Sequence, residues 1–179
     1  MFKGINIVIG VTGGIACYKV CEVISILTRE GANVDVIMTK NATEFITPLT
    51  LETLSKNKVI TDMFEKKEHV EVEHISLARK ADLILVIPAT ANIIGKVVNG
   101  IADDMVTSVL IATNKPVLFV PAMNTYMYEN KIVQANIKRL KEVGYDFLEP
   151  EVGMLACGVE GRGKIPKTST IVETIEKYF

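Results

Sequence analysis

The 179-residue sequence has no tryptophan, only three cysteines and two histidines, and nearly balanced charge, with 20 basic and 21 acidic side chains. So few cysteines and histidines exclude a disulfide-stapled fold or a zinc module, and we expect no metal site. A formal net charge of −1 gives no basic surface, so we expect no nucleic-acid partner. Because no secretory signal and no bilayer-length apolar run are visible, we expect no membrane partner and a cytoplasmic location with reduced thiols.

What the sequence does contain is apolar residues, which make up 49% of the chain against 23% charged residues. This composition is typical of a folded globular protein and excludes a disordered chain. A chain of this length can bury roughly 70% of the surface that its unfolded form exposes, so we expect one domain, residues 1–179. The apolar excess also leaves room for a buried ligand or an interface between copies.

Short apolar runs alternate with helical patterns along the chain. The runs predict strands buried on both faces, at residues 5–11, 33–38, 83–87, 117–120 and 146–148. Apolar spacing and capping signals predict helices at residues 15–30, 47–54, 103–112, 132–143 and 168–178. This alternation predicts a single-domain, doubly wound α/β fold with a parallel, Rossmann-like sheet. Residues 56–73 show no clear period, and residues 149–167 are expected to form a long glycine-rich loop.

Each strand is followed by a polar or glycine- and proline-rich segment. These segments are GVTGG at residues 10–14, TKN at 39–41, PATAN at 88–92 and PAMN at 121–124. In an open parallel sheet they share the carboxyl edge, where ligands bind, so their convergence predicts a ligand site. The first segment allows close backbone approach and favours an anion such as a phosphate at the start of the helix. A tight turn without a ligand is the alternative.

The end of the second strand distinguishes between cofactors. A dinucleotide-binding fold has an acidic residue there for the ribose hydroxyls. Here Thr39 occupies that place, and Asp35 lies in the middle of the strand. The hydroxyl and the nearby amide suit a mononucleotide phosphate better, which weakens the case for a nicotinamide dehydrogenase.

Three polar residues have both a functional and a structural interpretation. His74 precedes an apolar helical turn, where a lone histidine is more often a surface or capping residue than a catalyst. The amide of Asn124 could orient a carboxylate or cap a helix. The thiol of Cys157, in a glycine-rich loop, could exchange a proton near a closed site or be passive. Cys17 and Cys21 lie one helical turn apart and are expected in the core.

Six segments, in this order, resemble the homo-oligomeric flavin-containing cysteine decarboxylases over nearly the whole chain. They are GVTGGIA at residues 10–16, HISL at 74–77, PATAN at 88–92, NGIADD at 99–104, PAMNTYM at 121–127 and GMLACG at 153–158. Tyr128 stands where many members have tryptophan. The chain ends at Phe179, where many bacterial members continue into a second domain that ligates cysteine to phosphopantothenate. The sequence leaves open whether another protein supplies that activity or the chain is shortened.

The resemblance implies a Rossmann-like flavoprotein, a carboxy-lyase of coenzyme A biosynthesis that uses FMN to convert 4′-phosphopantothenoylcysteine to 4′-phosphopantetheine. In this family the substrate thiol is oxidised to a thioaldehyde, CO2 leaves, and the ene-thiol that remains is reduced again. The resemblance implies that His74 is the base, that Asn124 holds the substrate carboxylate and that Cys157 supplies the proton of the reducing step. Lantibiotic peptidyl-cysteine decarboxylases, which stop at the ene-thiol, lack that cysteine.

The resemblance also implies contacts and an assembly. The implied FMN contacts are Gly13, Thr39, Thr90, Ala91, Ala102 and Asp103. The implied substrate contacts are Asn124, Met127, Ala156, Cys157 and Lys164, with residues 153–164 as a clamp. Members assemble as trimers, or as dodecamers of trimers, with the active site between subunits.

Three alternatives remain beside this interpretation and the dehydrogenase. One is a peptidyl-cysteine decarboxylase of the lantibiotic type. Another is a non-catalytic flavin-binding interaction protein, against which the joint presence of His74, Asn124 and Cys157 argues. The last is a flavin prenyltransferase, which would not need the glycine-rich segment at residues 153–163.

Overall fold

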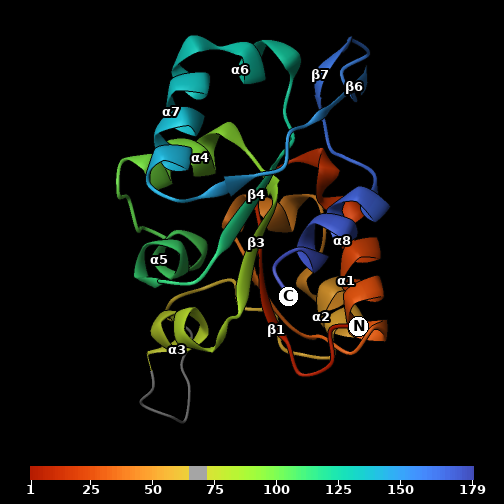
Figure 1. Cartoon of the computed structure of the whole chain (residues 1–179), viewed down its shortest axis with the longest axis vertical. Coiled ribbons are helices and arrows are strands. Elements are labelled where there is room, and N and C mark those ends of the chain that lie inside the picture. The colour runs from red at the N-terminus through yellow and green to blue at the C-terminus, as the bar shows by residue number, and fades with distance from the viewer. Residues whose placement is uncertain (65–71) are drawn as a thin grey trace.

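The computed structural model describes residues 1–64 and 72–179. Residues 65–71, which belong to the stretch 56–73 that showed no clear period, lie outside the described residues. Five parallel strands form the central sheet in the order β2-β1-β3-β4-β5 (Figure 1). Their bounds are β1 Asn6–Val11, β2 Asn33–Met38, β3 Leu83–Ala89, β4 Val117–Pro121 and β5 Asp146–Phe147. The predicted parallel α/β sheet is therefore confirmed.

Helices cover both faces of the sheet because the strands bury side chains on both sides. Along β1, Ile7 and Ile9 pack into one core cluster and Val8 into the other. Helices α1 (Val20–Arg29), α2 (Pro48–Ser55) and α8 (Thr168–Glu176) cover the first face (Figure 1). The second face is covered by α3 (Glu73–Lys80), α4 (Ala91–Val98), α5 (Met105–Ala112) and α7 (Lys131–Glu142). The described residues also form three short helices, η1 (Ile15–Lys19), η2 (Lys40–Glu44) and α6 (Thr125–Glu129).

The strand order creates a crevice at the carboxyl edge of the sheet. Strand β1 lies between β2 and β3. The chain leaves β1 toward α1 on one face and leaves β3 toward α4 on the other. Two connections that run to opposite faces leave room between them. Such a place is called a topological switch point, and doubly wound folds bind ligands there.

Several elements differ from the sequence-based expectation. Residues 15–30 form the separate helices η1 and α1 rather than one helix. Strand β3 continues past the expected end through Pro88, with a register shift between Val86 and Ala89. Helix α4 was not predicted. No helix within residues 1–64 and 72–179 is long and apolar enough to cross a membrane.

The expected glycine-rich loop contains a two-stranded antiparallel hairpin. Its strands are β6 (Glu151–Met154) and β7 (Glu160–Lys164), and Gly153 lies opposite Gly161. Glycine is depleted in strands because it has no side chain to pack, so composition favours a loop here. The tertiary contact of β7 with α6 overrides that preference.

Candidate functional site

A cavity of about 690 Å³ lies at the carboxyl edge of the sheet, where the connections after the neighbouring strands β1 and β3 turn to opposite faces. This volume falls within the range of about 300–1,000 Å³ that is typical of small-molecule sites. The wall is formed by the segments after β1, β2, β3 and β4, as the sequence predicted, together with the β6–β7 hairpin. Its apolar part includes Ile15, Ala16, Ala122, Met123, Leu155 and Ile165.

The cavity brings together ten of the twelve residues to which the resemblance gives a role: Gly13, Thr39, Thr90, Ala91, Asp103, Asn124, Met127, Ala156, Cys157 and Lys164. Ala102 is not in its lining, although its neighbour Asp103 is. His74 is not in the lining either. It is half-buried on α3, which lies at the opposite end of the view from the hairpin (Figure 1). The roles of these twelve residues stay predictions.

The turn after β1 is fixed by contacts with the segments after β2 and β3. The buried Thr12 hydroxyl donates to the Pro88 carbonyl at 2.5 Å and accepts from the Thr90 N–H at 3.3 Å. A Cβ at Gly13 would lie 2.6 Å from Asn41 Cβ, so only glycine fits there. Within the described residues, the N–H groups of Gly13 and Gly14 donate no hydrogen bond. This leaves two backbone donors at the cavity wall for an anion.

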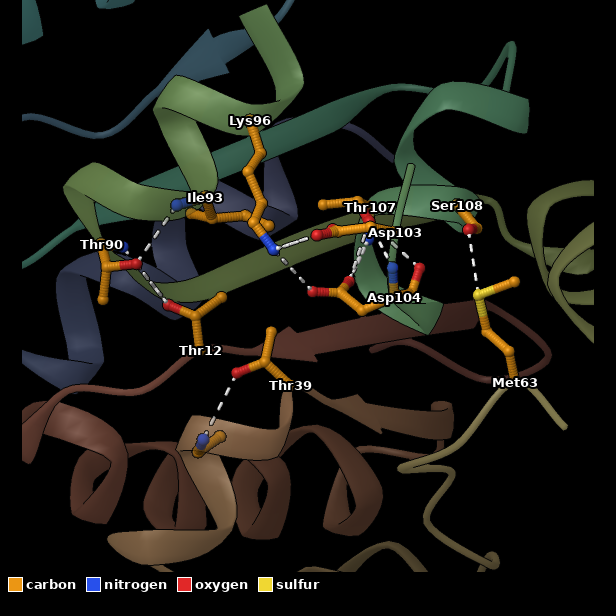
Figure 2. A network of polar contacts seen from close by, with 11 residues as sticks. Thr12, Thr39, Met63, Thr90, Ile93, Lys96, Asp103, Asp104, Thr107 and Ser108 are labelled. Atoms are coloured by element: carbon orange, nitrogen blue, oxygen red, sulfur yellow. Dashed lines mark hydrogen bonds and ion pairs between the residues drawn. The ribbon is translucent and has the colours of Figure 1, made fainter. Parts of the chain in front are cut away.

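Two threonine hydroxyls that are predicted to contact the ligand also act as helix caps. Thr39 Oγ1 accepts from the Ala42 N–H at 3.3 Å, at the start of η2. Thr90 Oγ1 accepts from the Ile93 N–H at 3.4 Å, at the start of α4 (Figure 2). Because the hydroxyl hydrogen remains free to donate, capping is compatible with ligand binding.

Asn124 combines the two interpretations that the sequence allowed. Its Oδ1 accepts from the Tyr126 N–H at 2.9 Å and caps α6, while its Nδ2 donates to Cys157 Sγ at 3.4 Å. Hydrogen bonds from the Val159 N–H and the Asn124 amide hold the pKa of the Cys157 thiol below its usual range. By contrast, burial raises the pKa of the Cys17 thiol, which donates to the Thr12 carbonyl. Of these two thiols, Cys157 therefore has the lower pKa.

The hairpin that carries Cys157 is seated on α6 and its flanking residues. The Met123 N–H donates to the Gly163 carbonyl at 3.1 Å, and Gly161 lies against Thr125. At the base of the hairpin, the buried Tyr128 hydroxyl donates to Glu149. Burial, followed by this hydrogen bond, raises the pKa of Tyr128 to about 12, so the phenol stays protonated at neutral pH. These contacts place the tip of the hairpin over the cavity.

Several lining residues were missed by sequence reasoning. Lys96 and Asp104 line the wall beside Asp103, and Lys19 and Lys40 add two cations. Helical spacing of apolar residues after Thr90 was the signal that would have placed Lys96 on a helix facing the site. Within residues 1–64 and 72–179, no group of three or more His, Cys, Asp or Glu side chains could hold a metal ion.

Comparison with known proteins identifies the family. The model of the flavoprotein family matches residues 1–179. The chain belongs to the flavoprotein family. It is 48% identical over 179 residues to the coenzyme A biosynthesis bifunctional protein CoaBC of Bacillus subtilis (strain 168), covering 100% of this chain and 44% of that protein. The chain thus spans less than half the length of this flavoprotein relative.

Other relatives match along their whole length. A probable phosphopantothenoylcysteine decarboxylase of Streptococcus mutans is 44% identical over 176 residues, which are 97% of this chain and 98% of that flavoprotein. Among solved structures, a PPC decarboxylase mutant complexed with pantothenoylaminoethenethiol superimposes with a TM-score of 0.87 at 28% identity, covering 97% of each chain. The FMN-dependent cysteine decarboxylase SpaF superimposes with a TM-score of 0.85 at 26% identity, covering 99% of each.

Proposed function

We propose that this flavoprotein binds FMN and decarboxylates 4′-phosphopantothenoylcysteine to 4′-phosphopantetheine in coenzyme A biosynthesis. The observation that carries the proposal is one cavity whose wall contains both the Gly13–Gly14 turn, with two free backbone donors, and the Asn124–Cys157 pair. Two relatives support it: one, at 44% identity, is named as a probable phosphopantothenoylcysteine decarboxylase, and the other, at 48%, as a bifunctional protein of coenzyme A biosynthesis. We place the FMN-binding decarboxylase domain at residues 1–179.

The residues of the cavity fit FMN. The free N–H groups of Gly13 and Gly14 and the hydroxyls of Thr39 and Thr90 are donors that suit its phosphate. The apolar wall suits a flat ring, with Ala91 and the segment Ala102–Asp103 as further proposed contacts. When bound, FMN would take two electrons from the substrate thiol, which makes loss of CO2 easy, and would return them afterwards.

The residues at the hairpin side suit the substrate. Asn124 Nδ2, which faces the Cys157 thiol, can donate to the carboxylate that leaves as CO2. The Cys157 thiol can then deliver the proton that completes the saturated product. The ammonium of Lys164 lies over Gly153 and forms no ion pair within the described residues, so it is free to bind the substrate phosphate. Met127 and Ala156 would contact the substrate chain.

We propose that a neighbouring copy supplies His74 as the base, in a trimer or a dodecamer of trimers. The support is that His74 lies outside the cavity of its own chain, while Ile15 and Tyr18 at the cavity wall are 58% and 63% exposed.

The three cysteines of the chain are unpaired, in keeping with a reducing compartment, and we propose a cytoplasmic location.

The test is mass spectrometry of the products after the FMN-loaded protein meets 4′-phosphopantothenoylcysteine. We expect 4′-phosphopantetheine from the unchanged protein, an accumulating ene-thiol from Cys157→Ser, and normal product from the control Cys21→Ser. No conversion with FMN bound would refute the substrate, and conversion of a peptide with a C-terminal cysteine would favour the peptidyl alternative.

A second experiment tests the shared site. His74→Asn and Cys157→Ser are each expected to form no saturated product alone. Co-expressed, they should regain activity, because some mixed sites combine an intact His74 with an intact Cys157 from different copies. Absence of any recovery in mixed oligomers would show that both residues act within one chain.

A further inference from the structure

Lys96 holds the connection between α4 and α5 through its backbone. At the end of α4 the Gly100 N–H donates to the Val97 carbonyl and the Ile101 N–H donates to the Lys96 carbonyl, both at 3.0 Å. This pair of hydrogen bonds is a Schellman motif, which needs a left-handed residue that glycine supplies, here with a φ of +69°. The turn folds the chain back toward the Lys96 side chain.

The Lys96 side chain holds the other end of the same connection. Its Nζ donates to both carboxylate oxygens of Asp103, at 2.8 and 2.9 Å, and lies 3.6 Å from Asp104 Oδ2 (Figure 2). Asp104 Oδ1 is already committed to α5, since it accepts from the Thr107 N–H at 2.8 Å in a capping box. One ammonium thus joins α4 to the start of α5.

This network lies at the cavity wall and contributes one ammonium and two carboxyl groups to it. Lys96, Asp103 and Asp104 all line the cavity, and Figure 2 shows them near Thr90 and Thr39. The Lys96 side chain is 24% exposed and the Asp103 side chain is 55% exposed, so water screens the ion pair mainly from the side of Asp103. The hydrogen bond from Lys96 holds the pKa of the Asp103 carboxyl below its usual range, and the same bond raises the pKa of Lys96. The Lys96 ammonium and the Asp103 carboxylate are therefore both charged at neutral pH.

We propose that Lys96 is a positioning residue for FMN. Its ammonium neutralises the adjacent Asp103 and Asp104 carboxylates and holds residues 101–104 against the cavity. This inference rests on the proposed binding of FMN. Without the ammonium, two carboxylates face the site of a ligand that carries a phosphate. FMN is then repelled, and the segment proposed to contact it loses its tether.

The test is the dissociation constant of FMN, measured by fluorescence quenching on the FMN-free protein. Lys96→Met should weaken binding about tenfold, the effect of losing a hydrogen bond to a charged group. Lys96→Arg should stay within about threefold of the unchanged protein because it keeps the charge. The double variant Lys96→Met with Asp103→Asn should recover most of the loss, because asparagine removes one unneutralised carboxylate and keeps the size and one side-chain oxygen of the residue proposed to contact FMN. The matched control is Lys138→Met, which removes an exposed lysine paired with Glu142 on α7.

The outcomes separate this inference from the proposed function. If the unchanged protein does not bind FMN, both fail. If it binds FMN and Lys96→Met binds within about threefold of it, the role of Lys96 is refuted. A double variant that binds as weakly as Lys96→Met, or an equal loss in Lys138→Met, also refutes it. Hydrogen exchange of the FMN-free protein should be faster over residues 99–104 in Lys96→Met, and unchanged exchange would contradict the tether.

Discussion

Replacing Gly161 by alanine should unseat the hairpin from α6. Its φ does not require glycine, but its surroundings do. A Cβ there would overlap Thr125 Oγ1 and lie 2.9 Å from Thr125 Cγ2. Overpacking of this kind lowers the stability of a folded protein by about 1–3 kcal/mol. We expect Gly161→Ala to lower the free energy of unfolding by that amount, measured by urea denaturation at a fixed protein concentration.

A double-mutant cycle isolates the contact. Thr125 Oγ1 is buried and has no hydrogen-bond partner among the described residues, so Thr125→Ala removes an unsatisfied hydroxyl and one methyl group. These effects oppose each other, and we expect a net change under about 1 kcal/mol. In the Thr125→Ala background, Gly161→Ala should cost about 1–2 kcal/mol less than in the original chain. Additivity within about 0.5 kcal/mol would refute the contact.

A matched glycine in α4 serves as the control. Among the described residues, a Cβ at Gly95 would meet Asn136 Nδ2 alone, at 4.0 Å, so Gly95→Ala should stabilise the protein by about 0.5–1 kcal/mol. A functional readout goes with the cycle. If Gly161→Ala lifts the hairpin, Cys157 loses the bond from Asn124 and its alkylation by iodoacetamide becomes slower at neutral pH. An unchanged alkylation rate would show that the hairpin tip does not depend on this seat.

Other contacts of the site give further predictions. Asn124→Ala removes a donor that lowers the pKa of Cys157, so the pH of half-maximal alkylation should rise; an unchanged midpoint would count against the bond. Limited alkylation followed by mass spectrometry should find Cys157 modified before Cys17, whose thiol pKa is raised by burial. Burial would raise the pKa of Glu149, but hydrogen bonds from an ammonium and a phenol bring it below its ordinary value. The ionised Glu149 carboxylate therefore stabilises the fold above pH about 4.3, and this effect is lost as pH falls through the pKa of Glu149 in the folded protein. In Glu149→Gln the free energy of unfolding should depend less on pH in the acid range. Protonated Tyr128, with its pKa raised to about 12, stabilises the fold below pH about 10 and loses this effect by pH about 12, and Tyr128→Phe should remove that alkaline loss.

The sequence predicted the parts of the fold that local pattern decides. Each buried strand contains a short apolar run, and each run is followed by a polar or glycine- and proline-rich segment, into which β3 extends as far as Ala89. Because parallel strands end at one edge, Gly13, Thr39, Thr90 and Asn124 could be expected around one site before their distances were known, and the cavity brings them together. The strand order could not be predicted in this way, because it depends on which way each crossover turns.

Long-range contacts account for what the sequence did not predict. Lys96 follows Gly95 on a helix that composition did not reveal, and its pairing with Asp103 depends on the turn at Gly100. The position of His74 relative to the cavity depends on how α3 packs against α5, which its own segment does not encode. A residue's chemistry was visible from its neighbours in sequence, but its partner across the fold was not.

The hairpin shows most clearly why glycine content misleads a sequence-based prediction. Gly161 and Gly163 look like the residues of a mobile loop, yet each lies where a side chain would collide with the region around α6. Their lack of a Cβ allows backbone to approach backbone, and the Met123–Gly163 hydrogen bond forms across that gap. This close approach of β7 to the region of α6 positions the tip of the hairpin. There Asn124 Nδ2 donates to Cys157 Sγ, 33 residues further along the sequence. These glycines therefore help to fix the geometry of the thiol rather than to loosen it.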